Sequence, residues 1–98
     1  MEKRSPHYRL PTVKALIEQG KVYATMTALN GAEAMGFGFD GMITVILSLT
    51  IADFYKSMTT YSDHKLWHDV YRPTTAAGEV YLKLTVIDGV LIVSFKEL

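Results

Sequence analysis

The chain has 98 residues, of which 49% are hydrophobic and 20% charged, with no cysteine and a formal net charge of zero. A chain of this length forms about one small domain, here residues 1–98. The lack of cysteine excludes a disulfide framework and a thiolate metal site, and the neutral balance argues against a non-specific nucleic-acid binder. The charged start is no secretory signal, and residues 42–52 are too short to span a bilayer. We therefore expect a cytoplasmic protein that does not contact a membrane.

The basic side chains are unevenly distributed. Residues 1–21 carry five lysines and arginines against two glutamates. A basic arm of this kind could contact phosphates, but the pattern favours a solvated terminus that frays.

The first half of the chain is predicted to be helical. Leu10-Pro11 opens the first helix, because proline is tolerated at the first helical positions, and Gly20 ends it. A short strand at 22–23 follows. Thr25 or Thr27 then caps a second helix, which Gly36 ends.

A third helix is predicted from Gly41 to about Leu49, with Asp40 as its cap. This helix is apolar on nearly every side, so we expect it to belong to the core. The spacing of Thr50 and Asp53 is that of a capping box and predicts a short helical turn.

After this turn the hydrophobic period changes to two, which is typical of strands. Strands are predicted at 54–61 and 67–72, with loops at 62–65 and 74–78. Because the helices precede the strands and do not alternate with them, the order predicts an α+β fold.

The strongest local signal is Asp88-Gly89, which predicts a β-hairpin over residues 79–97 with a two-residue turn. Such a turn makes the numbers of paired residues sum to 177. On one face this register predicts three core pairs, Leu82 with Phe95, Leu84 with Val93, and Val86 with Leu91. On the other face it pairs Tyr81 with Lys96 and Lys83 with Ser94.

Two further patterns are weak. Residues 36–41 match the G-x-G-x-x-G letters, but no strand precedes them, so a dinucleotide site is not favoured. His64 and His68 have the spacing of a helical metal pair, yet they fall in a predicted loop and strand. Structural or solvent-facing histidines are therefore favoured over a metal site formed with Asp63 and Asp69.

The pair of Tyr81 and Lys96 could carry chemistry. A lysine favours the phenolate of a neighbouring tyrosine and stabilises charge on phosphate oxygens, and the tyrosine can act as a general acid or base. The pattern alone nevertheless favours an ordinary cross-strand pair on a solvated face. Lys56 is open to the same two interpretations, and so are the aromatic residues that could stack on bases, Tyr55, Tyr61, Trp67 and Tyr71.

Four segments carry a resemblance to a known family, namely Phe39 to Met42, Asp53 to His64, Asp69 to Pro73 and Val90 to Glu97. The chain resembles the motility quorum-sensing regulator (MqsR) toxins of bacterial type II toxin–antitoxin modules. The resemblance runs over the whole chain, and the uninterrupted run from Asp53 to His64 is highly specific.

The resemblance implies one mRNA-interferase toxin domain with a RelE-like fold, in which N-terminal helices pack on a twisted antiparallel sheet that ends in the 79–97 hairpin. It implies a metal-independent endoribonuclease without cofactors that cuts mRNA at GC-containing triplets. It also implies neutralisation by the antitoxin MqsA. In that pair, the zinc and the helix-turn-helix that binds operator DNA belong to the antitoxin.

The resemblance also implies a catalytic set. The family uses two lysines, a tyrosine and a glutamine, and the first three fall on Lys56, Lys96 and Tyr81. The fourth falls on His68, where the family commonly has glutamine. Unlike glutamine, histidine could act as an acid or base near neutral pH.

These residues suggest in-line attack of a ribose 2′-hydroxyl on its own 3′-phosphate. Tyr81 or His68 would handle the 2′ proton, while Lys56 and Lys96 would stabilise the phosphorane. Two alternatives remain open from the residues themselves. One is a non-catalytic RNA- or protein-binding module, and the other is a metal-dependent hydrolase built from Asp63, His64, His68 and Asp69.

Overall fold

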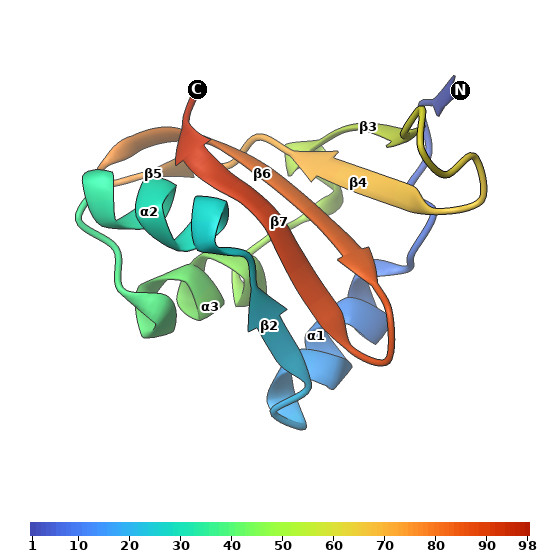
Figure 1. Cartoon of the computed structure of the whole chain (residues 1–98). Helices are drawn as coiled ribbons and strands as arrows, with labels where there is room; N and C mark the ends of the chain where they lie inside the picture. The colour runs from blue at the N-terminus through green and yellow to red at the C-terminus, as the bar shows by residue number, and fades with distance from the viewer.

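The computed structural model describes all 98 residues, and its three helices cover one face of a mixed β-sheet (Figure 1). The helices are α1 (Leu10–Glu18), α2 (Met26–Ala34) and α3 (Phe39–Leu47), followed by the 3₁₀ turn η1 (Ile51–Asp53). The strands are β1 (Glu2–Lys3), β2 (Val22–Ala24), β3 (Phe54–Thr59), β4 (Trp67–Tyr71), β5 (Thr74–Thr75), β6 (Gly78–Val86) and β7 (Val90–Glu97). The predicted α+β class is confirmed.

The first two helices begin and end where the local signals indicated. Leu10 and Pro11 are the first residues of α1, and Gly20 beyond its end has a φ of 78°, a value that glycine adopts without strain. Thr25 is the cap of α2, since its hydroxyl oxygen accepts a hydrogen bond from the Ala28 amide at 3.0 Å. The capping box of Thr50 and Asp53 is also present.

The predicted cap of α3 is wrong. Its cap is Gly38, so the helix begins before Asp40, which lies in the first turn and faces the positive end of the helix dipole. The helix does belong to the core as predicted, through the buried side chains of Met42, Val45 and Ile46. Its other side is partly open, since Phe39 and Leu47 are 40% and 37% exposed.

The sheet has the strand order β1-β3-β4-β6-β7-β2, with β5 paired to β6 beside it. Its central strands are antiparallel as predicted, but β2 runs parallel to β7, so the sheet is mixed. The predicted loop at 74–78 contains the short strand β5, which turns back onto Gly78 and Glu79.

The hairpin of β6 and β7 follows the predicted register only in its open half, the half farther from the turn. Tyr81 pairs with Lys96, Leu82 with Phe95, and Lys83 with Ser94. Beyond this point a bulge shifts the pairing by one residue. The predicted pairs of Leu84 with Val93 and of Val86 with Leu91 are therefore wrong, and the observed pairs are Leu84 with Ile92 and Val86 with Val90.

The cause of the bulge lies in the turn. Three residues, Ile87 to Gly89, connect the strands, and Asp88 and Gly89 both have positive φ values, 56° and 148°. The amide of Val90 donates to the carbonyl of Lys21 at 2.9 Å, which ties the turn to the chain just before β2. The extra residue in β7 turns Val90 and Ile92 into the core, where both are fully buried.

The N-terminal segment is docked, so the prediction of a fraying terminus is wrong. β1 pairs antiparallel with β3, and the amides of His7 and Tyr8 donate to the two carboxylate oxygens of Asp69 at 3.0 and 2.9 Å. Asp69 is fully buried, so these two hydrogen bonds satisfy a charge that would otherwise be costly to bury. The basic arm is thereby held against the sheet.

One core lies between the helices and the sheet. Its largest fully buried side chains come from α3, β4, β6 and β7, and include Met42, Tyr71, Leu82 and Phe95. Gly31 allows α2 to pack closely against β7, because a Cβ at this position would clash with the carbonyl oxygen of Phe95. This contact brings α2 directly against the end of β7 that carries Lys96.

Candidate active site

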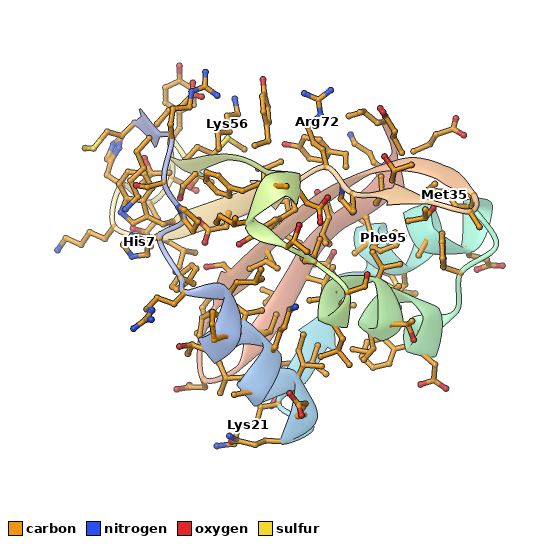
Figure 2. The ribbon with its side chains drawn as sticks, turned by 180° about the vertical axis from the view of Figure 1, so that it is seen from behind. His7, Lys21, Met35, Lys56, Arg72 and Phe95 are labelled. Atoms are coloured by element: carbon orange, nitrogen blue, oxygen red, sulfur yellow. The ribbon has the colours of Figure 1, made fainter.

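Alternation along the strands separates two faces of the sheet. The core face carries Tyr71, Leu82 and Phe95, and the face away from the helices carries the polar side chains that pair across the strands. Figure 2 shows Lys56 and Arg72 projecting from the sheet on the same side, while Phe95 and Met35 lie toward α2. We call the helix-free side the open face.

The register places all four predicted catalytic residues on the open face. Lys56 pairs with Val70, Val70 with Lys83, and Lys83 with Ser94, so these four residues form one row across the sheet. Tyr81 and Lys96 form the next row toward the open end of the hairpin. His68, paired with Met58, lies in the next row on the other side.

These rows show which candidates the fold brings together. The Lys96 ammonium lies 5.4 Å from the centre of the Tyr81 ring, within the range of a cation–π contact. His68 lies two rows away from the row of Tyr81. Neighbouring rows are two residues apart, so the separation along the strands is roughly 13 Å. Tyr81 and His68 therefore stand at opposite ends of the site and cannot share one proton.

Lys56 is held by an acid from the docked N-terminus. Its ammonium lies 2.9 Å from a carboxylate oxygen of Glu2 in β1. This hydrogen-bonded ion pair raises the pKa of Lys56 and lowers that of Glu2. Lys56 is thus a stable cation, and its counter-ion is a neighbouring side chain that an incoming phosphate anion could displace.

His68 is buried, with 7% of its surface exposed, and its Nδ1 atom has no hydrogen-bond partner. Burial lowers the pKa of His68 below its ordinary value of 6.5, and the charge of Lys83 lowers it further. The imidazole is consequently neutral at pH 7. In that state it can accept a proton, which a glutamine cannot do.

Lys83 is a site residue that the sequence prediction did not include. It lies in the same row as Lys56, and Tyr81 is in the next row of the same strand. His68 and Lys96 are its diagonal neighbours, each on an adjacent strand and in an adjacent row. Burial lowers the pKa of Lys83, and the charge of Lys96 lowers it further. The feature of the sequence that could have indicated Lys83 is its position two residues after Tyr81, which places both side chains on the same face of β6.

A second feature that the sequence prediction left open is a cluster of cations around Tyr55, which is 38% exposed. The guanidinium of Arg72 lies 4.7 Å from the centre of its ring, and Arg4 and Lys56 each lie at 5.5 Å. An aromatic ring among cations suits both a stacked base and its phosphate. The cluster extends the basic character of the open face beyond Lys56.

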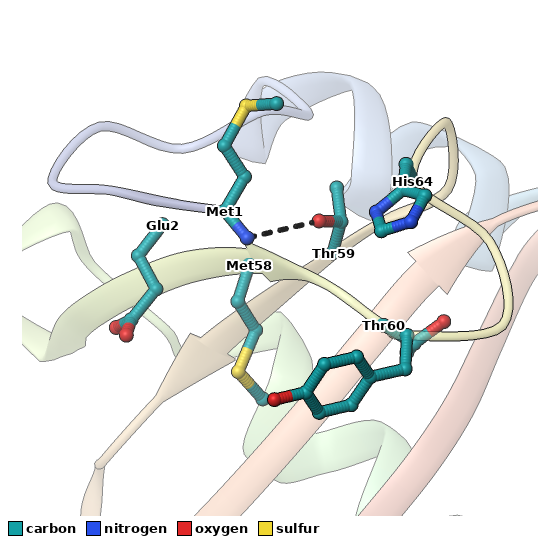
Figure 3. A pocket seen from close by; sticks show the side chains of 7 residues that line it. Met1, Glu2, Met58, Thr59, Thr60 and His64 are labelled. Carbon is teal, nitrogen blue, oxygen red and sulfur yellow. Dashed lines mark hydrogen bonds between the residues drawn. The ribbon is translucent and has the colours of Figure 1, made fainter.

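A hollow of about 260 Å³ lies at the far end of β3. Glu2 and Met58 extend to one side of β3 there, and Met1, Thr59 and His64 to the other (Figure 3). The Met1 amino group donates to the Thr59 hydroxyl at 3.3 Å. None of the four predicted catalytic residues lines this hollow, so it adjoins the candidate site without being part of it.

The residues of the alternative metal site do not converge. No group of three histidine, aspartate or glutamate side chains is close enough to hold an ion. Asp69 lies in the interior, where its oxygens accept hydrogen bonds from the amides of His7 and Tyr8, and the neighbouring His68 lies on the opposite face of β4.

None of the helices is long and apolar enough to cross a membrane.

The protein is of the α+β class, and its open face gathers lysines, a tyrosine and a histidine, groups whose chemistry suits a phosphodiester. Residues 5–97 match the family model described as "Motility quorum-sensing regulator, toxin of MqsA". The chain is also 61% identical over 97 residues to the mRNA interferase toxin MqsR of Escherichia coli (strain K12), an alignment that covers 99% of each chain. The chain therefore belongs to the MqsR toxin family, which confirms the resemblance and the assignment as a toxin and an endoribonuclease.

Proposed function

We propose that this chain is the toxin of a type II toxin–antitoxin pair and cuts mRNA at GC-containing triplets without a metal ion. The observation that carries this proposal is the placement of Lys56, Tyr81 and Lys96 on one open face of the sheet. The high identity to an mRNA interferase supports RNA as the substrate.

The reaction is attack of the ribose 2′-oxygen on the adjacent 3′-phosphorus. A base removes the 2′ proton, the new bond from the 2′-oxygen to phosphorus forms, and the bond from phosphorus to the 5′-oxygen breaks. The products are a 2′,3′-cyclic phosphate and a 5′-hydroxyl end. The protein therefore has to hold the phosphate in line, take one proton and stabilise the charge of the phosphorane.

Lys56 and Lys96 stabilise the phosphorane. They lie on β3 and β7, on either side of the central strands, so a phosphate over the middle of the open face meets cations from two directions. Fixed cations at the position where negative charge develops are an effective substitute for a metal ion. This arrangement is the physical support for metal-independent cleavage.

Either Tyr81 or His68 takes the 2′ proton, and the geometry makes these two assignments exclusive. His68 is neutral because burial lowers its pKa, which suits a base at neutral pH. For Tyr81 the supporting observation is the Lys96 ammonium, which lies 5.4 Å from the centre of its ring. If His68 is the base, the rate of cleavage falls in acid with an apparent pKa below 6.5, and the His68→Gln variant lacks this acid limb.

The test is cleavage of a short single-stranded RNA with one GC-containing triplet by purified protein, with and without EDTA. We expect cleavage in both, a cyclic phosphate at the new 3′ end, and loss of activity in Lys96→Ala. Loss of wild-type cleavage in EDTA would refute the metal-independent mechanism. RNA binding without cleavage would favour the non-catalytic module.

The partner that fits this assignment is the antitoxin MqsA, which the family description names. In this proposal MqsA neutralises the toxin in the cytoplasm, carries the zinc, and connects the complex to operator DNA. The same proposal assigns the fold to the RelE-like type. Growth arrest on expression of the wild type, relieved by co-expression of MqsA and absent for Lys96→Ala, tests these assignments together.

A further inference from the structure

Lys83 occupies the centre of the open face without an acidic partner. It pairs with Val70 on β4 and with Ser94 on β7, and neither side chain carries a charge. The single ion pair of the chain is that of Lys56 with Glu2, so no carboxylate lies within salt-bridge distance of Lys83. A half-buried lysine with no counter-ion is unusual, because burying an ammonium group is costly unless it is paired.

The groups that face Lys83 come from each strand around it. They are Lys56 on β3, His68 on β4, Tyr81 on β6 and Lys96 on β7. None of these side chains is a carboxylate, and two of them are lysines. Burial and the charge of Lys96 lower the pKa of Lys83 from its ordinary value of 10.5, so its ammonium group gives up a proton more readily than an ordinary lysine does.

The proposed reaction needs a proton donor, and the roles proposed above for Lys56, Lys96, Tyr81 and His68 do not include one. When the bond between phosphorus and the 5′-oxygen breaks, the oxygen leaves as an alkoxide unless it is protonated. Lys56 is a poor donor because its hydrogen bond to Glu2 raises its pKa, and the neutral His68 is suited to accept a proton. Among the candidate residues, Lys83 combines a central position with a proton that it can release.

We propose that Lys83 is a further catalytic residue, the general acid that protonates the departing 5′-oxygen. This inference rests on the proposed cleavage reaction. The electron pair of the broken bond goes to the 5′-oxygen, the proton passes from the Lys83 Nζ to that oxygen, and a 5′-hydroxyl leaves. Lys83 is then a neutral amine and regains a proton from water, which balances the proton lost by the 2′-hydroxyl.

The test compares an ordinary RNA with the same RNA carrying sulfur in place of the 5′-bridging oxygen at the scissile position. A thiolate leaves without protonation, so this substrate needs no general acid. We expect Lys83→Met to lose roughly 100-fold in rate on the oxygen substrate and to approach the wild-type rate on the sulfur substrate. Lys56→Met is the matched control, and its loss should persist on both, because it stabilises the phosphorane with either leaving group.

Lys83→Arg separates proton donation from charge. Arginine keeps the positive charge but does not release its proton at these pH values, so we expect Lys83→Arg to resemble Lys83→Met. An Arg variant with the wild-type rate on the oxygen substrate, or a Met variant equally impaired on both substrates, would overturn the proposal. Absence of cleavage by the wild type on either substrate would instead refute the proposed function.

Discussion

The two faces of the central strands differ in what their side chains do, although they alternate along the same backbone. His68 and Asp69 are sequence neighbours, yet one borders the open face with an unpartnered nitrogen and the other holds the N-terminal segment from the interior. Tyr81 and Tyr71 likewise lie on adjacent strands and on opposite faces. A period of two therefore separates the proposed catalytic side chains from those that build the interior of the fold.

The largest expected effect is on the open face, from Tyr81→Phe. This change removes only the phenolic oxygen, so a role in proton transfer predicts a loss of about 1000-fold in the rate of RNA cleavage. The free energy of unfolding should not change, because Tyr81 is only half-buried and its ring remains. The measurements are single-turnover cleavage and denaturant unfolding.

Two results would contradict that assignment. Full activity of Tyr81→Phe would remove Tyr81 from the reaction and leave His68 as the base. A loss of activity that is matched by a loss of stability would indicate a structural role, and would weaken the separation of the two faces.

The next largest effect is expected on the core face, from Asp69→Ala. The change leaves the buried amides of His7 and Tyr8 without acceptors, and we expect a loss of about 2 kcal/mol in the free energy of unfolding. Denaturant unfolding measures it. Asp40→Ala in the exposed first turn of α3 is the comparison and should lose less, because it removes only an interaction with the helix dipole.

A consequence for activity should accompany the loss of stability in Asp69→Ala. Release of the N-terminal segment frees Glu2 from Lys56, so RNA binding should depend differently on salt than it does in the wild type. If stability is unchanged, the two hydrogen bonds do not hold the segment in solution.

The sequence predicted the open half of the hairpin because its signals are local. Alternation of apolar residues and Asp88-Gly89 were sufficient to pair Tyr81 with Lys96. The other half was mispredicted because the turn has three residues, Ile87 to Gly89, and not the two that Asp88-Gly89 indicated. The turn is also tied from outside the hairpin by the hydrogen bond of Val90 to Lys21, which no pattern within residues 79–97 reveals.

The same distinction applies to the candidate site. Family resemblance supplied Lys56 and His68, which no periodicity could connect to the hairpin. The register paired Lys83 with Ser94, but no role was predicted for Lys83, because its central position comes from strands β3 and β4 on the other side of β6. The docking of Glu2 on Lys56 was missed because a two-residue strand has no period to detect.

A smaller effect concerns the pH dependence of stability through His68. Its pKa is lower in the folded protein than in the unfolded chain, so the unfolded chain binds the proton more tightly. The contribution of the neutral His68 to the free energy of unfolding should therefore be fully present above pH 6.5, and it should be lost as the pH falls through the pKa of His68 in the folded protein.

In His68→Gln this part of the decline should be absent. Denaturant unfolding of both proteins at several pH values between 7 and 5 gives the difference. Parallel curves would show that the imidazole is not buried in solution, and His68 would then lose its main qualification as a base.

The smallest effect is expected from Tyr71→Phe, the core counterpart of Tyr81→Phe. The hydroxyl of Tyr71 is buried without a hydrogen-bond partner, and its ring packs edge-on against Phe54 with the ring centres 5.5 Å apart. Removing the hydroxyl keeps this packing and removes an unsatisfied group, so the variant should be more stable by about 1 kcal/mol. RNA cleavage should be unchanged.

Alkaline pH sharpens the same comparison. Burial raises the pKa of Tyr71 to about 12, whereas a tyrosine in the unfolded chain has the ordinary value of 10.0. Because the folded value is the higher one, wild-type stability that is complete below pH 10 declines as the pH rises toward 12. The stability advantage of Tyr71→Phe should therefore grow over this range. A constant difference would show that the Tyr71 hydroxyl is hydrated, and the core face would then be less dry than the fold implies.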